Sequence, residues 1–388
     1  MKKLLKIVIV LLLILVNFNN AITVYADTQS DLEKATNEQL ESLDLDDLQK
    51  ILDTYQNGEI ILSDDIKSLL SDIINGNYIE YFNSNKIISI VLNEFKGIKE
   101  YIPIFITMIC IGIIISILKE FNLTKREDIS SIINVVFIGF IIVIILMQIS
   151  NFINITKDTL GNIKKQMDAI FPVLLTIMTA LGSSKSVSFF QPIITLICNV
   201  VIDFMINLGL PLLILSLVLV ICLSLSKNIK LTKLNNFLQN SFRWGIGLIF
   251  TIFMAVIAIQ GIVVSNFDSI SIRTVKYTIK SFIPFGNFFA DSLNIIMASS
   301  VLIKNAIGFS GLIILFFSIL EPIISILCFK FLLDFSSGLL EPICNKNLCE
   351  LFTNISKILT MLIITIVVCS IMYLILIATI MSVANNFI

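Results

Sequence analysis

The sequence predicts an all-α, polytopic membrane protein with a small helical head at its N-terminal end. A helix needs about 18 to 20 apolar residues to cross about 30 Å of hydrocarbon. From Tyr101 onward runs of this length follow one another, and they do not alternate as barrel strands do. Composition agrees, since 56% of the 388 residues are hydrophobic and 14% are charged, against about 25% charged in soluble domains. The clearest runs are 132–149, 208–225, 245–264, 305–329 and 358–382.

Residues 1–26 have the pattern of a secretory signal peptide. Three lysines precede the apolar stretch 7–16, and Val24 and Ala26 occupy the −3 and −1 positions of a cleavage site. We expect cleavage after Ala26, and the alternative is an uncleaved first helix. Under either alternative residues 27–100 lie outside the cytoplasm.

The segment 27–100 is predicted to be an acidic helical head. It contains 16 Asp/Glu and 6 Lys, a net charge of −10, whereas residues 101–388 carry a net charge of +6. About 70 residues bury little core of their own. Instead of a self-contained bundle, we therefore expect the apolar helical faces of the head to pack on a partner protein or on the membrane domain. Those faces comprise Leu45, Leu48, Ile51, Leu52, Tyr55, Ile66, Leu69, Leu70, Ile73, Ile74, Ile87, Ile88, Val91, Phe95 and Ile98.

Basic residues predict the topology of the membrane domain, residues 101–388. The loops 119–130 and 226–243 are rich in Lys and Arg, which the positive-inside rule assigns to the cytoplasm. The loop 150–168 is then expected on the extracytoplasmic side. For these assignments to agree, residues 169–207 must cross the membrane an even number of times.

Two parts of the membrane domain are expected to be broken or re-entrant, near 169–207 and near 282–303. Irregular backbone at membrane depth occurs where it is buried in protein or lines water, and paired broken segments are typical of transporter sites. The alternative is that these residues only let helices pack closely. The candidate helix-breaking residues are Pro172, Gly182, Pro192, Pro284, Gly286, Gly308 and Pro322.

Three acids in apolar surroundings are candidate functional residues: Asp203, Asp291 and Glu321. A carboxylate is costly in a bilayer, so each is expected to face protein or water. Each could contact a proton or a cation. The alternative for each is an interhelical hydrogen bond.

Nothing in the sequence predicts catalysis. The chain has no histidine, which excludes Ser-His-Asp and Cys-His arrangements and His-based zinc sites. It also lacks a Walker A sequence and a GxGxxG motif. We therefore expect no catalytic residues, no cofactor, no metal site and no enzyme activity.

Several stretches resemble the stage III sporulation protein AE family of endospore-forming bacteria. They are DDIKSLLSDIINGN in the head, DAIFPVLLTIMTALGSSKSVSFFQP in mid-chain and FIPFGNFFADSLNIIMASSVLIKNAIGFSGLIILFFSILEP further on. The last stretch contains the element Lys304-Asn305-x-x-Gly308, and Glu341-Pro342 also fits the family. The order and spacing of these stretches carry the resemblance over nearly the whole chain.

The resemblance implies a membrane subunit of a multiprotein sporulation complex. Such a complex lies in the mother-cell membrane around the forespore and forms a channel or secretion-like conduit needed for forespore development and late forespore gene expression. The implied partners are other membrane proteins of the complex and the lipid bilayer, not nucleic acid. The alternative function is a stand-alone secondary transporter or permease for a small solute or ion.

Overall fold

In the computed structural model the described residues are 29–56, 65–77, 84–120, 127–225, 231–282, 286–342 and 346–383. These ranges are helical apart from turns and contain no strand, which confirms the all-α class. The expected signal peptide lies outside them. The elements are α2 (Gln29–Ser42), α3 (Asp46–Gln56), α4 (Ile66–Ile74), α5 (Ser84–Glu120), α6 (Glu127–Ala180), α7 (Ser184–Thr195), the π-helix η4 (Leu196–Val201), α8 (Ile202–Phe204), the π-helix η5 (Met205–Gly209), α9 (Leu210–Leu225), α10 (Thr232–Phe282), α11 (Gly286–Leu340) and α12 (Lys346–Ser382).

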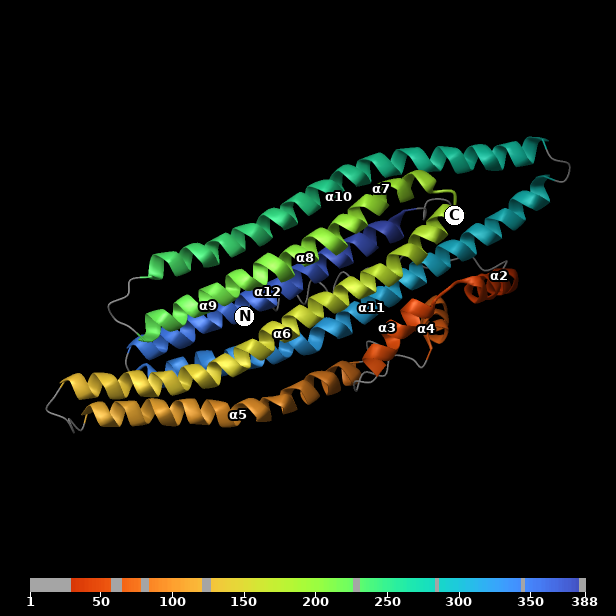
Figure 1. The fold of residues 1–388 in the computed structure, drawn as a ribbon. Coiled ribbons are helices and arrows are strands. Elements are labelled where there is room, and N and C mark those ends of the chain that lie inside the picture. Colours follow the sequence, from red (N-terminus) through yellow and green to blue (C-terminus); the bar gives the residue numbers. More distant parts are fainter. Residues whose placement is uncertain are drawn as a thin grey trace.

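The long helices lie side by side and alternate in direction along one elongated bundle (Figure 1). Six helical segments of the described ranges are long and apolar enough to cross a membrane. The end of α5 and start of α6 lie at the same end of the bundle as the end of α9 and start of α10 (Figure 1). The two loops expected in the cytoplasm are therefore flanked by helices that meet at one end of the molecule.

The helices α11 and α12 form the centre of the bundle. In the apolar part of α12, 72% of the residues are buried, and in that of α11, 61%. The corresponding shares are 22% in α10 and 17% in α5, which lie at the periphery. From Val301 to Ile319 nearly every side chain of α11 is buried among its neighbours.

The helices of the head pack on the membrane helices. Both α2 and α4 contact α11, while α3 contacts α6. The apolar faces of α3 and α4 that the sequence indicated are buried there, including Leu48, Leu52, Leu69 and Leu70. Gly76 follows α4 with a φ of 80°, the left-handed conformation of a helix C-cap. The chain itself thus covers apolar faces of the head that could otherwise have needed a partner.

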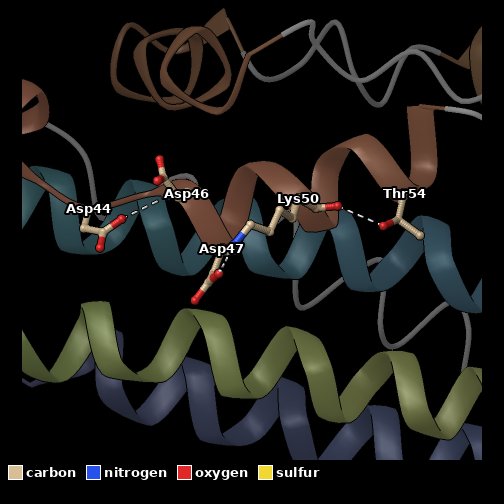
Figure 2. A network of polar contacts seen from close by, with 5 residues as sticks. All are labelled: Asp44, Asp46, Asp47, Lys50 and Thr54. Atoms are coloured by element: carbon tan, nitrogen blue, oxygen red, sulfur yellow. Dashed lines mark hydrogen bonds and ion pairs between the residues drawn. The ribbon is translucent and has the colours of Figure 1, made fainter.

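The opposite side of α3 is charged and exposed (Figure 2). Lys50 pairs with Asp47 at 2.8 Å, and both side chains are more than 70% exposed. The hydrogen bond from Lys50 to Asp47, together with the attraction between the two charges, raises the pKa of Lys50 above its ordinary value. The backbone N–H of Asp46 donates to Asp44 Oδ1 at 3.3 Å. This face of α3 is therefore polar and open to its surroundings in the described structure.

Where a broken or re-entrant stretch was expected, residues 169–207 contain the end of α6, a reversal of the chain and the start of the next helical segment. The helix α6 continues through Pro172 as far as Ala180. Gly182, with a φ of 79°, then reverses the chain. The N–H groups of Gly182 and Ser183 donate to the carbonyls of Thr179 and Met178, which is the Schellman arrangement of a helix end. From Ser184 the chain is helical to Leu225, with π-helical turns at η4 and η5.

Two further expectations require correction. Residues 150–168 are not a loop, because they belong to the middle of the continuous helix α6. Residues 169–207 were expected to cross the membrane an even number of times because 150–168 was expected to be a loop, so this expectation is wrong as well. The first part of 169–207 completes α6, and the second part begins the next antiparallel segment. In the segment 282–303, expected to be broken or re-entrant, α10 ends at Phe282 and residues 286–303 are the regular first turns of α11, while 283–285 lie outside the described residues. Intrahelical hydrogen bonding continues through these small and polar residues because none of them is a proline.

Candidate functional site

Lys304 is the most unusual side chain of the bundle. It lies on α11, its side chain is fully buried, and it is among the largest side chains with no exposed surface. Its Nζ donates a hydrogen bond of 3.0 Å to the carbonyl of Met381 and another to the carbonyl of Val383. A buried cation is costly unless polar partners satisfy it. The structure supplies those partners at the C-terminal end of α12.

The position of Lys304 suits the electrostatics of a helix end. The last carbonyls of a helix have no intrahelical donor, and the end carries partial negative charge. A basic side chain there commonly comes from the same helix. Here it comes from a different helix, 77 residues earlier than Met381. Lys304 therefore connects α11 with the end of α12.

Two glycines on α11 let α12 and α6 approach closely beside Lys304. A Cβ atom at Gly308 would lie 2.6 Å from the side chain of Met381. A Cβ atom at Gly311 would lie 2.6 Å from Ile170 and 3.2 Å from the Tyr373 hydroxyl. Distances below 3.0 Å require a neighbour to move. Gly308, predicted as a helix break, instead lies inside a continuous helix, where it permits close packing.

Further polar side chains of these three helices are buried as well. Gln166 on α6, Asn305 on α11 and Tyr373 on α12 are each at most 5% exposed. The Tyr373 ring also packs edge-on against Phe171, with ring centroids 5.8 Å apart. We call Lys304, Gly308, Gly311 and Tyr373 the α11–α12 junction. It holds three long helices together through polar as well as apolar contacts.

Asp203 lies on the short helix α8, between two π-helical segments. Its carboxylate pairs with Lys164 of α6 at 2.9 Å. The side chains are 46% and 27% exposed, respectively, so the pair is open to its surroundings. The sequence left two roles open for Asp203, a contact to a proton or cation and an interhelical hydrogen bond. The observed contact joins two helices and is an ion pair.

The other two candidate acids have separate surroundings. Glu321 is an exposed residue of α11, immediately before the buried Pro322. Asp291 belongs to the second turn of α11, and its side chain lies outside the described part of the chain. Within the described ranges no three acidic or cysteine side chains are placed to hold a metal ion.

The remaining candidate breaks differ from one another. Pro172, Pro192 and Pro322 lie inside helices that continue past them. At Pro172 the Thr176 hydroxyl donates to the proline's carbonyl at 2.8 Å. Gly286 begins α11, and Pro284 lies outside the described residues. Gly182 is the position at which the described chain reverses direction.

Lys304 was not among the candidate functional residues chosen from the sequence, although the sequence contained a signal for it. Lys304 stands alone in an apolar stretch, and an ionisable residue in such a stretch is a functional candidate by default. Its partners could not be predicted, because a backbone carbonyl at the other end of a 37-residue helix has no sequence signature.

Comparison with known proteins identifies the family of this chain. The model of the family described as stage III sporulation protein AE matches residues 65–384, which include α4 to α12. This chain belongs to the stage III sporulation protein AE family. The relative of that name from Bacillus subtilis (strain 168) is 24% identical over 366 residues, which cover 93% of this chain and 90% of the relative. No solved structure matches the chain.

The residues matched by the family model include the α11–α12 junction. Among them are Lys304, Gly308 and Gly311 as well as Tyr373 and Met381. The first two head helices, α2 and α3, precede the matched residues. The membrane bundle and α4 are therefore the part of this chain for which the family is shown, and they include the whole α11–α12 junction.

Proposed function

We propose that this protein is an integral membrane subunit of a sporulation channel complex, a secretion-like conduit between mother cell and forespore. In this role it supports forespore development and late forespore gene expression. Its place is the mother-cell membrane around the forespore, with the head on the extracytoplasmic side. The role is non-catalytic, and it depends on neighbouring membrane proteins.

The packing of α11 and α12 is the observation that carries this proposal. A self-contained transporter needs polar groups that converge on an interior path. Here side chains of α11 and α12 fill the centre of the described bundle, and the buried Lys304 is bonded to the end of α12. The acids Asp203 and Glu321 lie toward its outside instead. This supports a conduit whose walls come from several proteins, with this bundle as one of them.

The alternative is a stand-alone transporter of a small solute or ion. Its motivation is the unusual α7–α9 segment, which contains two π-helical stretches next to the Lys164–Asp203 pair. Such π-helical turns frequently occur at functional sites. The alternative predicts that purified protein alone moves solutes across liposomes at a physiological rate.

Co-purification of the native complex from sporulating cells tests the proposal. Full-length tagged protein is expected to bring down other membrane proteins of the sporulation complex. A variant with Asp44→Lys and Asp47→Lys reverses two exposed charges, one just before α3 and one in its first turn, without touching its buried face. We expect this variant to recover less of the complex. Glu350→Lys, an exposed position near the opposite end of the bundle, is the matched control. Transport by the isolated protein, with no partner recovered, would favour the alternative.

A further inference from the structure

The outward-facing side chains of α6 change in character partway along the helix. Up to Met147 its well-exposed residues are large and apolar: Val135, Val136, Phe140, Val143 and Met147. From Ser150 the exposed positions carry no large hydrophobic side chain. They are Ser150, Asn151, Asn154, Lys157, Asp158, Lys165, Asp168, Pro172, Thr176, Thr179 and Ala180. The change falls within three residues.

The length of α6 requires such a change. Its apolar segment, Val135–Ala180, has 46 residues, which makes about 70 Å of helix at 1.5 Å per residue. The hydrocarbon core is about 30 Å thick. Even a tilt of 40°, the upper end of the observed range, lengthens the path only to about 39 Å. About 30 Å of this segment must therefore lie outside the hydrocarbon.

Two contacts of α6 show that the part outside the hydrocarbon is its C-terminal half. The ion pair of Lys164 with Asp203 is partly exposed, which is costly in hydrocarbon and ordinary in water. The charged helix α3 packs against α6. In Figure 1, α3 lies beside the part of α6 that follows its midpoint, away from the end where α5 meets α6. A head with a net charge of −10 cannot sit in lipid.

We infer that α6 leaves the bilayer between Met147 and Ser150 and that its remaining part, about 45 Å long, stands in water on the side of the head. The bundle then consists of a membrane half and an extramembrane half that share the same continuous helices. The contact between Gly311 and Ile170 belongs to the extramembrane half.

The boundary is not level around the bundle. On α10 large exposed apolar side chains continue as far as Ile259, which is 65% exposed. Leu248 of α10 borders the same apolar groove as Phe204, the neighbour of Asp203. The apolar surface of α10 therefore extends further from the shared basic end than the apolar surface of α6. The bundle crosses the bilayer obliquely, and α6 emerges first.

Single cysteines along α6 test the boundary in the full-length protein. In a cysteine-free background reconstituted in nanodiscs, Phe140→Cys and Met147→Cys mark the apolar side, and Asn154→Cys, Lys165→Cys and Thr176→Cys mark the polar side. Each is labelled with an environment-sensitive fluorophore. We expect blue-shifted emission, quenched by lipid-bound quenchers, at the first two positions. At the last three we expect red-shifted emission that is quenched by iodide.

Hydroxyl-radical footprinting of the wild-type protein in nanodiscs gives a second measurement without substitutions. Modification is expected at Lys165 and Pro172, and protection at Phe140 and Met147 despite the high intrinsic reactivity of Met. The inference is overturned if iodide quenches positions 165 and 176 no more than position 140. Protection of Lys165 and Pro172 equal to that of Phe140 overturns it as well.

Discussion

The helices α12 and α10 are both apolar enough to cross a membrane, but their surroundings differ. In the apolar part of α12, 72% of the residues are buried, against 22% in α10. The exposed residues of α12 lie in its first turns and at its last residue, Ser382, whereas α10 exposes the large side chains of Phe237, Trp244 and Leu248. Lipid tails are as apolar as leucine, so the ability to cross a membrane does not show whether a helix is surrounded by protein or by lipid. Most side chains in the apolar part of α12 are buried against other helices, whereas most of those in α10 are not. Substitutions at contacts of α12 are therefore expected to have larger effects than substitutions on the exposed face of α10.

The largest effect is expected for a bulky side chain at the α11–α12 junction. Gly308→Leu places atoms where Met381 already lies, within 2.6 Å of the position of the new Cβ. Overpacking of this kind costs about 3 kcal/mol. The thermal unfolding of detergent-purified protein should shift strongly downward. Gly338→Leu, at an exposed glycine of the same helix with no neighbouring atom within 4 Å, is the control. Equal losses in both variants would contradict the importance of the close approach.

A smaller loss is expected when Lys304 is replaced by methionine. The Lys304→Met variant keeps the length of the side chain but removes the donor to the carbonyls of Met381 and Val383. Leaving buried polar groups unsatisfied costs about 1–3 kcal/mol. Amide hydrogen exchange should accelerate in the last turn of α12. Lys357→Met, at an exposed lysine of α12, should leave that exchange unchanged. Unchanged exchange in Lys304→Met would show that the lysine does not hold this helix end.

The candidate acids allow a comparison of function rather than of stability. Asp203→Asn weakens a partly exposed ion pair with Lys164, and such pairs contribute about 0–1 kcal/mol. From the sequence we predict that Asp291→Asn lowers spore yield more than Asp203→Asn does. Spore counts at matched protein levels measure both. A wild-type spore yield in the Asp291→Asn strain would rule out a charge requirement at that position.

The smallest effect is expected on the exposed face of α10. Trp244 is 79% exposed and borders a shallow apolar groove with Phe204 and Leu248. Trp244→Ala removes few contacts within the chain, so the unfolding free energy in detergent should change by less than about 0.5 kcal/mol. A loss as large as that of Gly308→Leu would mean that α10 is not peripheral. A loss of complex recovery from cells without a loss of stability would identify this face as a contact for a neighbouring protein.

Much of the fold could be predicted because the decisive signals are local. The all-α class follows from the length of the apolar runs, and the buried faces of α3 and α4 follow from their periodicity. The reversal at Gly182 and the cap at Gly76 follow from residues that adopt positive φ easily. The loop assigned to 150–168 was wrong because its charges indicated a break between spans. In the structure they lie on the surface of an unbroken helix.

The sequence by itself determined the class of the protein, its helical segments and the acidic character of the head, since these depend on composition and on spacing along the chain. The tertiary structure alone decided which apolar helices form the centre, that the head packs on α6 and α11, and that Lys304 reaches the end of α12. The physical reason is that side chains facing lipid and side chains facing protein satisfy the same requirement for apolar surface. Only the three-dimensional arrangement, which joins residues as distant as Lys304 and Met381, shows which of the two each side chain meets.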